Sequence, residues 1–596
     1  MILINLSNIL WISKLRKKLK LNKHMKSIYK PKLLVLISII MISQKLFCQI
    51  IIDESYDDWK NISNKTVDPI NDANGLIDFK EMNIWNDSVY LYINFEINSE
   101  INLQESSKIL LNIDIDNNSN TGKSINGIGA DVVYDYGQRT GFYIRNGIYY
   151  DFSHVECSLL SLPTVTSGKF EQALKRKFNA GNYLVNFGNK IRISLSYDGS
   201  GGDIIPNQSG GYLYQMNSDK LQVPVFSIKK KSLDHLRLMS LNVKQDGYFI
   251  NESPYKRILK SIAADIFCFQ EIYDHSSGDV SYKIKNYFGG NWYDAKVGTD
   301  IIVVSKYPIL NYVAIGGNGA FLIDYKGKEI LVINVHLYCC DNDTGRQTEV
   351  DEIMSFIKKA KTGTGSFTIK KNTPIIITGD TNFVGKNRQR KTLIEGDIMN
   401  ENSFGTDFLP DWDNSFFEDA KPVTTGYPGS FTWKSYYSDY PAGRLDYIIY
   451  SSSVLKLENT YVLNTELLSR DILEEFQMNN EDSYNSSDHL PIVADFTLKD
   501  ISGSYDIENE STIIDIYPNP ANDIIYINNN NSDIKINEIL ICNREGLILK
   551  KIEIGKNIFY EEFAIDIYDL VDEDYYMIFI DKSGKIYLLR KFIKIK

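Results

Sequence analysis

The chain has 596 residues, a formal net charge of −11 and a hydrophobic content of 43%. That length is too great for one hydrophobic core and predicts three or four domains. Residues 1–48 contain ten Lys or Arg and no Asp or Glu, so the remainder carries a net charge of −21. Such a chain is not built for tight, general binding to polyanions, although a local basic groove or a bound cation could still serve a nucleic-acid substrate.

Residues 1–48 are typical of a secretory signal region. Lys26, Lys30 and Lys32 precede the apolar run 33–42, which is short for a membrane span. We expect cleavage before Gln49. The true start of the chain could be Met25, which places the basic residues directly before the apolar run.

Residues 50–225 predict an antiparallel β-sandwich, a first binding module. Apolar and polar residues alternate over the runs 88–95, 108–114 and 190–195, as expected of strands with one buried face. Asp114, Asp116 and Asn118 place oxygen atoms at alternate positions before a glycine, which suits a calcium ion. An Asx-rich hairpin turn is the alternative interpretation of this segment.

The acidic segments of this module resemble those of DOMON and family-nine-type carbohydrate-binding modules. The resemblance rests on Asp57-Asp58-Trp59, on the strand after Asp87, and on the segment 114–122 followed by Gly129-Ala130-Asp131. It implies that carbohydrate is a possible partner of the module.

Polar side chains follow apolar runs at several places between residues 236 and 498. In 375–380, for example, three isoleucines lead to Asp380, which indicates a buried strand that stops at a carboxylate. A lone buried carboxylate is unfavourable, so such residues usually pair with another group or bind a metal. The polar residues of these segments are Asn242, Glu271, His336, Asp380 with Asn382, Asp446, and Asp488 with His489.

These segments, in this order, resemble the endonuclease/exonuclease/phosphatase superfamily, the metal-dependent phosphoesterases of the DNase I type. The resemblance implies a four-layer α/β sandwich over 236–498 and a divalent cation, magnesium or manganese. Glu271 is implied as the main metal ligand, with Asn242 and Asp488 beside it.

The same resemblance assigns the catalytic roles. Asp380 and the His489–Asp446 pair orient and deprotonate water, while Asn382 and His336 stabilise the pentacoordinate phosphate. A phosphodiester is hydrolysed in this way by in-line attack of water.

The substrate is less well specified than the chemistry. Lys386, Arg388 and Arg390 follow Asn382 closely and could track a nucleic-acid backbone, although a solvated basic loop is equally plausible. We therefore expect a sequence-tolerant extracellular nuclease. One alternative is a phosphomonoesterase, or a sphingomyelinase or phospholipase C-type phosphodiesterase, on the same fold. Another is a surface carbohydrate-binding protein with an inactive phosphoesterase domain.

Cys339 and Cys340 are adjacent in the sequence. A disulfide between neighbouring residues is strained, Cys268 is a rival partner, and free thiols are equally plausible.

Residues 512–596 predict a third, small β-sandwich. The opening Tyr517-Pro518-Asn519-Pro520 and the basic end resemble the C-terminal sorting domain of proteins exported by type IX secretion. The resemblance implies that the secretion machinery is a partner and that the protein is secreted or held at the cell surface.

Overall fold

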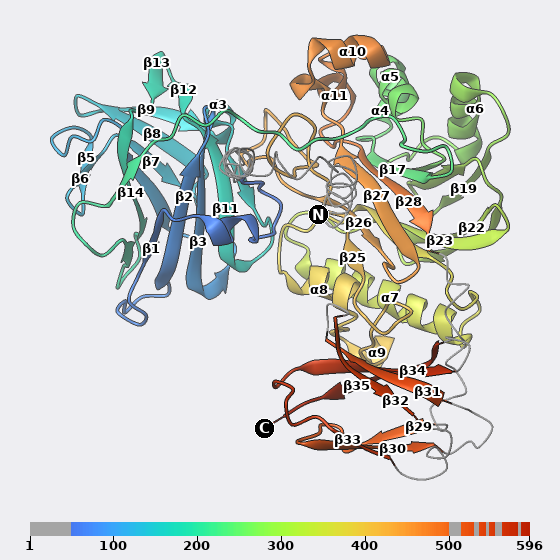
Figure 1. Cartoon of the computed structure of the whole chain (residues 1–596). Coiled ribbons are helices and arrows are strands. Elements are labelled where there is room, and N and C mark those ends of the chain that lie inside the picture. Colours follow the sequence, from blue (N-terminus) through green and yellow to red (C-terminus); the bar gives the residue numbers. More distant parts are fainter. Residues whose placement is uncertain are drawn as a thin grey trace, which may run out of the picture. The chain divides into compact units, whose positions relative to one another are not determined.

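The computed structural model describes residues 49–105, 107–499, 514–529, 536–543, 547–554, 563–581 and 586–595. The predicted signal region 1–48 lies outside these residues. The chain forms two compact units, residues 1–499 and 500–596. Sheets dominate both units (Figure 1), in agreement with the sheet-based folds predicted for all three modules. No described helix is long and apolar enough to cross a membrane.

The N-terminal part of the first unit is built from two antiparallel sheets. The first has the order β1 (Lys65–Val67), β2 (Phe79–Asn86), β3 (Tyr90–Ile101), β11 (Ser167–Lys175) and β10 (Leu160–Leu162). The second has the order β15 (Ile204–Ile205), β14 (Lys190–Tyr197), β4 (Ile109–Asp114), β7 (Val132–Asp135), β8 (Thr140–Arg145) and β9 (Ile148–Ser153), with β16 (Tyr212–Gln215) also on β14. Smaller elements are η2 (Asp58–Asn61), α3 (His154–Cys157) and the hairpins β5 (Lys123–Ile125)–β6 (Ile128–Ala130) and β12 (Lys177–Ala180)–β13 (Tyr183–Asn186).

Strand β3 explains why this sandwich joins the next part of the chain in one unit. Leu91, Ile93 and Phe95 face the core between its own two sheets. Tyr90 and Tyr92, on the opposite face of the strand, belong to the core of the following domain. Because both faces of β3 are buried in apolar surroundings, the predicted modules 50–225 and 236–498 are held together.

The middle domain contains two six-stranded sheets. One has the order β19 (Tyr293–Val297), β20 (Ile301–Ser305), β18 (Ile266–Gln270), β17 (Leu236–Asn242), β28 (Ile492–Leu498) and β27 (Leu455–Val462). The other has the order β21 (Ile309–Ile315), β22 (Asn318–Tyr325), β23 (Lys328–His336), β24 (Ile375–Asp380), β26 (Asp446–Tyr450) and β25 (Glu418–Asp419). Only the pairs β17–β18 and β23–β24 are parallel among the paired strands described in this domain.

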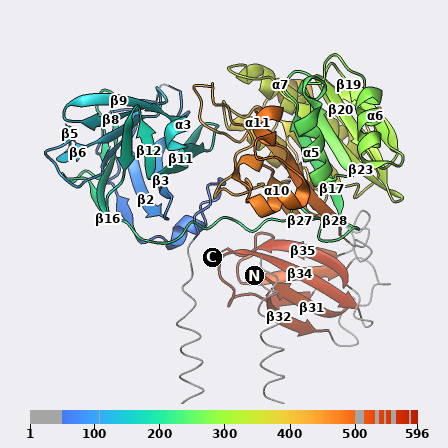
Figure 2. The same ribbon diagram turned by 90° about the horizontal axis from the view of Figure 1, so that it is seen from above.

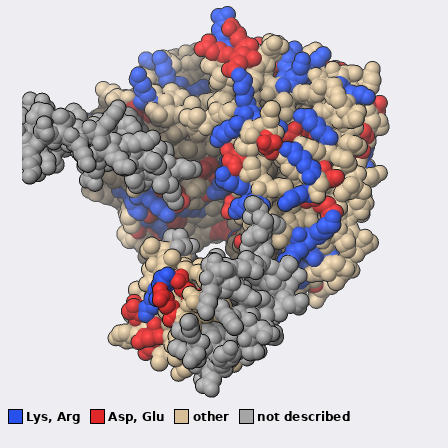
Figure 3. All heavy atoms as spheres, turned by 45° about the vertical axis from the view of Figure 1, so that its right-hand side comes forward, with Lys and Arg blue, Asp and Glu red and all other residues tan. Residues whose placement is uncertain are grey.

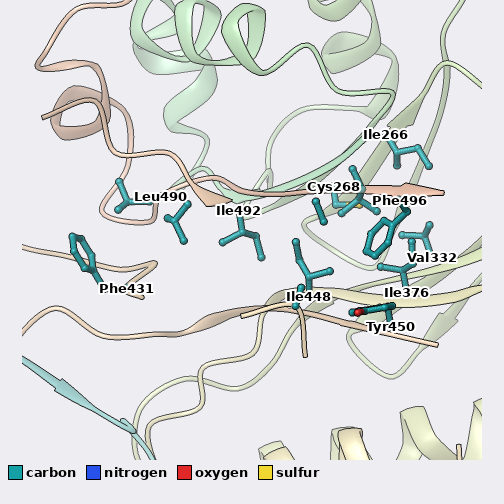
Figure 4. Close-up of a cluster of buried hydrophobic side chains, with 14 of the residues drawn as sticks. Ile266, Cys268, Val332, Ile376, Phe431, Ile448, Tyr450, Leu490, Ile492 and Phe496 are labelled. Carbon is teal, nitrogen blue, oxygen red and sulfur yellow. The ribbon is translucent and has the colours of Figure 1, made fainter. Parts of the chain in front are cut away.

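Apolar side chains fill the space between the two sheets. In Figure 4, Cys268, Ile492 and Phe496 point from one sheet toward Ile376 and Ile448 of the other. Each of these side chains is fully buried. Burial on this scale stabilises the sandwich by roughly 1.5–3 kcal/mol for each large side chain.

Helices cover the outer faces of both sheets (Figure 1). Above the first sheet in that view lie α4 (Gly247–Ile250), α5 (Glu252–Ile262), α6 (Ser277–Phe288), α10 (Arg470–Phe476) and α11 (Asp482–Ser486). Below the second lie α7 (Asp343–Thr362), α8 (Arg388–Glu395) and α9 (Glu401–Phe404). The short helix η3 (Thr465–Leu467) precedes α10 in the chain. Figure 2 looks down on α5 and α6. Both parallel connections run through these helices, with α5 between β17 and β18 and α7 between β23 and β24.

The second unit is a small sandwich of two sheets. Their orders are β29 (Ile514–Tyr517), β30 (Ile524–Asn529) and β33 (Phe563–Asp566), and β32 (Ile548–Glu553), β31 (Ile536–Cys542), β34 (Asp574–Asp581) and β35 (Ile586–Ile593). Ile525, Ile539 and Phe579 pack in one core between them.

Candidate active site

The parallel strands of the middle domain end at one edge of the sandwich. Asn242 is the last residue of β17, and Glu271 directly follows β18. His336 and Asp380 end β23 and β24 and are register partners. Gly379 allows this close approach, because a Cβ atom there would lie 2.0 Å from the carbonyl oxygen of Val335. Side chains from both sheets therefore meet where the parallel strands stop.

Asn242 links the two central carboxylates. Its Nδ2 donates to Glu271 Oε1 at 2.9 Å and to Asp380 Oδ2 at 3.0 Å. Its Oδ1 accepts from the backbone N–H of Lys244, and the residue is fully buried. In this orientation Asn242 presents a donor to both carboxylates and thereby positions them.

His489 and Asp446 form a buried pair beside Asp380. The Nδ1 of His489 lies 2.9 Å from Asp446 Oδ2, and its Nε2 lies 3.6 Å from Asp380 Oδ2. Burial alone lowers the pKa of His489, but the charges of Asp446 and Asp380 outweigh burial and raise it to about 10. Burial also raises the pKa of Asp446, against the effect of His489. Because the imidazole faces two carboxylates, we place the shared proton on His489.

A second His–Asp pair also lies beside Asp380. The Nδ1 of His336 is 2.6 Å from Asp300 Oδ2, and its Nε2 is 3.8 Å from Glu271 Oε1 and 3.9 Å from Asp380 Oδ2. Burial opposes protonation of His336, but the hydrogen bond to Asp300 and the nearby carboxylates raise its pKa to about 9. Asp300 was not among the residues predicted from the sequence. Its one signal was a carboxylate directly before the apolar run 301–305.

The chemistry of this cluster fits a divalent cation. Glu271 and Asp380 each offer a carboxylate oxygen, and these oxygens lie within 4.8 Å of one another and of His336 Nε2. Glu271 is also fixed by a bond from the backbone N–H of Gln245 to its Oε2. Two carboxylates with room for water match what magnesium prefers. Their combined negative charge, which holds both histidines protonated, is what a cation would offset.

A cleft of about 890 Å³ opens over this cluster. Glu271, His336, Asp380 and His489 line its floor, and Tyr273, Trp433 and Tyr440 contribute aromatic surface. Asn102 and Thr164 of the N-terminal sandwich form part of a wall. They are held there by hydrogen bonds from Asn102 Nδ2 to the Val384 carbonyl (3.1 Å) and from Thr164 Oγ1 to the Phe383 carbonyl (2.6 Å).

Comparison with known families agrees with this geometry. Residues 239–489 match the Endonuclease/Exonuclease/phosphatase family, and residues 515–596 match the secretion system C-terminal sorting domain. The middle of the chain is an endonuclease/exonuclease/phosphatase domain. The sorting domain assigns the protein to type IX secretion, to the cell surface or the extracellular space. Neither match covers the N-terminal sandwich, so its resemblance to carbohydrate-binding modules stays a prediction.

Several solved structures are similar to the chain. The humanized D. rerio TDP2 with 14 mutations has 15% identity and covers 44% of this chain and 99% of its own, with a TM-score of 0.30. ANGEL2, a 2',3'-cyclic phosphatase, has 21% identity and covers 44% and 95%, with a TM-score of 0.30. The Staphylococcus aureus beta toxin has 20% identity and covers 44% and 99%, with a TM-score of 0.27. No curated protein matches the chain.

Asp488 and Asn382, two of the predicted site residues, contact groups outside the cluster of Glu271, His336 and Asp380. Asp488 Oδ2 pairs with Lys244 Nζ at 3.2 Å, and Asp488 is not part of the described clusters of close ligand atoms. Asn382 lies in the cleft, where its Nδ2 donates to the Leu337 carbonyl at 3.0 Å. One amide hydrogen of Asn382 is thus in use, and the second remains for a substrate oxygen.

The basic segment after Asn382 does not line the cleft. Arg388 pairs with Asp397 at 2.8 Å, and Arg390 forms a close ion pair with Glu54 of the N-terminal sandwich. Lys386 is exposed. None of the three is among the residues around the described cleft. Arg390 instead joins the middle domain to the N-terminal sandwich, and Lys386 and Arg388 lie at the surface.

Cys339 and Cys340 lie at the rim of the cleft as free thiols, and Cys268 is free in the core.

The acidic cluster at the predicted calcium segment has different members from those predicted. Asp114 and Asp116 lie within 4.8 Å of Asp131, whereas Asn118 Oδ1 accepts from the Asn120 backbone N–H within the turn. Asp131 was not predicted as a member of this site because it lies beyond the acidic run, between β6 and β7.

Proposed function

We propose that this protein is a secreted, divalent-cation-dependent phosphodiesterase that acts as a sequence-tolerant nuclease. The observation that carries the proposal is the meeting of two carboxylates and two His–Asp pairs at one point of a cleft. The family match to residues 239–489 and the sorting domain support a hydrolase of phosphate esters that works outside the cell.

Glu271 would hold the cation. Asn242 donates to the carboxylates of both Glu271 and Asp380 and so keeps the Glu271 carboxylate close to Asp380. When bound, the cation supplies charge neutralisation at the phosphate. His489 donates from Nε2 to a phosphate oxygen, and Asp446 holds the ring in that orientation. Protonated donors preorganised in this way stabilise the charge that develops in the transition state.

Asp380 accepts a proton from the attacking water. The water oxygen bonds to phosphorus as the opposite ester bond breaks, and the leaving oxygen takes a proton from His336 Nε2. Asp300 supports this donor role because its carboxylate stabilises the protonated ring. Asp300 itself stays ionised: burial favours the protonated acid, but its contacts with His336 outweigh burial and lower the pKa of Asp300.

The cleft favours a short or single-stranded substrate over the interior of a duplex. Tyr273, Trp433 and Tyr440 offer surfaces on which unpaired bases can stack. No lysine or arginine is among the residues that line the described cleft. On the face of the protein in Figure 3, basic side chains are interspersed with acidic ones and form no continuous band. A long duplex depends on such a band for its affinity.

The same features favour a second candidate, a phosphatase or phospholipase C-type enzyme that acts on small esters. A cleft that is walled on one side and has no basic track holds a small phosphate ester as readily as a strand end. We therefore propose side-by-side assays with a short single-stranded oligonucleotide, plasmid duplex, sphingomyelin and a phosphate monoester, each with magnesium.

We expect the single-stranded oligonucleotide to be cleaved fastest. Turnover should require magnesium and should fall by several orders of magnitude in His489→Ala. Cleavage of only the lipid or the monoester would contradict the nuclease proposal. No magnesium-dependent turnover of any substrate would favour a binding protein with an inactive phosphatase-family domain.

A further inference from the structure

A second acidic cluster lies in the N-terminal sandwich, far along the chain from the segment 114–131. Asp68, Asp72, Asp78 and Asp203 each offer a carboxylate oxygen, and these atoms lie within 4.8 Å of one another. Asp68 follows β1, Asp78 precedes β2, and Asp203 precedes β15. The cluster therefore joins two loops that are more than a hundred residues apart in the sequence.

Three carboxylate oxygens in this cluster are buried without a hydrogen-bond partner. They are Oδ1 and Oδ2 of Asp68 and Oδ1 of Asp78. Asp68 is 2% exposed and Asp78 is 3% exposed. A buried carboxylate oxygen without a donor is unfavourable, and native proteins avoid it unless an ion or water fills the gap. Among the described residues, no lysine or arginine forms an ion pair with any of the four aspartates.

The other oxygens of the cluster hold the geometry in place. Asp203 Oδ2 accepts from the Phe79 backbone N–H at 2.6 Å, and Asp203 Oδ1 accepts from that of Ile204 at 2.7 Å. Asp78 Oδ2 accepts from the Asn71 backbone N–H at 3.0 Å. The loops themselves are in close contact, since a Cβ atom on Gly75 would lie 2.8 Å from the Gly201 carbonyl oxygen. The cluster is thus a fixed arrangement and not a chance meeting of flexible side chains.

We propose that Asp68, Asp72, Asp78 and Asp203 bind one calcium ion that fastens the loop 68–78 to the loop 199–203. Ligand oxygens on one calcium ion lie about 2.3–2.6 Å from it, hence no more than about 5 Å from one another. Four carboxylates suit calcium better than magnesium, which prefers one or two carboxylates and several waters. The ion supplies the positive charge that the three unpartnered oxygens lack.

The test is calcium binding and thermal unfolding of the full chain, with Asp68→Asn as the main variant. At saturating calcium, flow dialysis should show one ion fewer per chain in Asp68→Asn than in the wild-type protein. Calcium should raise the Tm of the wild-type protein by a few degrees over EGTA. In EGTA, Asp68→Asn should melt at or above the wild-type temperature, because it removes like-charge repulsion.

Two further variants separate this site from others. Asp151→Asn removes the same charge from an exposed position of the same sandwich and should keep the wild-type stoichiometry. Asp131→Asn affects the segment 114–131 and should leave binding at Asp68 intact. Asp72 is exposed, so Asp72→Asn should fold even if Asp68→Asn does not, and it should weaken calcium binding at this site by about tenfold or more.

Unchanged stoichiometry and affinity in both Asp68→Asn and Asp72→Asn would overturn the proposal. The proposal would also be overturned if the Tm of the wild-type protein were the same in calcium and in EGTA but fell as the pH rose. That outcome would mean that a shared proton, and not a calcium ion, relieves the repulsion among the four carboxylates. Neither outcome bears on the phosphodiesterase proposal, which depends on residues of the middle domain.

Discussion

Replacing Asp446 by Asn tests the buried His–Asp pair directly, because it removes one charge and keeps the shape of the side chain. Burial opposes protonation of His489, yet Asp446 and Asp380 raise its pKa from 6.5 to about 10. The charge of Asp446 is the foremost cause of that rise, so its loss lowers the pKa of His489 and weakens the protonated donor. The amide also no longer fixes the tautomer of the ring. We expect kcat/KM to fall by about 10²–10⁴.

The assay is the initial rate of magnesium-dependent phosphodiester cleavage between pH 5 and 10. Because His489 acts as a protonated donor, activity is lost as the pH rises through the pKa of His489. In Asp446→Asn this loss should begin at a lower pH than in the wild-type protein. Asp397→Asn is the matched control, since Asp397 pairs with Arg388 outside the cleft. A variant within threefold of the wild-type kcat/KM, with an unshifted pH profile, would refute the role of Asp446.

Three further changes probe separate parts of the first unit. Asp300→Asn should lower kcat/KM by about 10–100-fold with little change in KM, because Asp300 orients His336; an unchanged kcat would remove that role. Glu54→Gln leaves Arg390 and Arg444 without their shared buried partner, and it should lower the free energy of unfolding by about 3–5 kcal/mol in urea titrations. Unfolding at the wild-type urea concentration would show that this ion pair adds nothing. Burial raises the pKa of Glu349 to about 7, so the stability that Glu349 contributes is present below about pH 4.5 and is lost as the pH rises through 7. Glu349→Gln should therefore be more stable than the wild-type protein at pH 8 by up to about 3 kcal/mol, and equal stability of the two chains at that pH would contradict this assignment.

The contacts between the N-terminal sandwich and the middle domain bear on specificity as well as stability. Asn102 directly follows β3, which Tyr90 and Tyr92 anchor in the neighbouring core, and Thr164 lies between β10 and β11; both residues line the cleft. Removal of the sandwich would expose this apolar surface and take away one wall of the cleft.

The sequence by itself determined the features that depend on neighbouring residues. An apolar run that ends in a polar residue predicts a strand end, and such runs indicated Glu271, His336 and Asp380 before the structure placed them near one another. The Tyr-Pro-Asn-Pro opening likewise identified the sorting domain, which the family match confirms. These signals are readable because backbone periodicity and turn chemistry act over a few residues.

Only the tertiary structure decided which distant groups become partners. Asp300 meets His336, Arg390 meets Glu54, and Asp203 meets Asp68 across separations that no local pattern records. For the same reason a basic run beside Asn382 predicted substrate contacts, whereas the folded chain pairs Arg388 and Arg390 with carboxylates. The energy of a charged side chain depends on the groups that lie within a few ångströms of it. Strand register and the packing of one domain against another determine which groups these are.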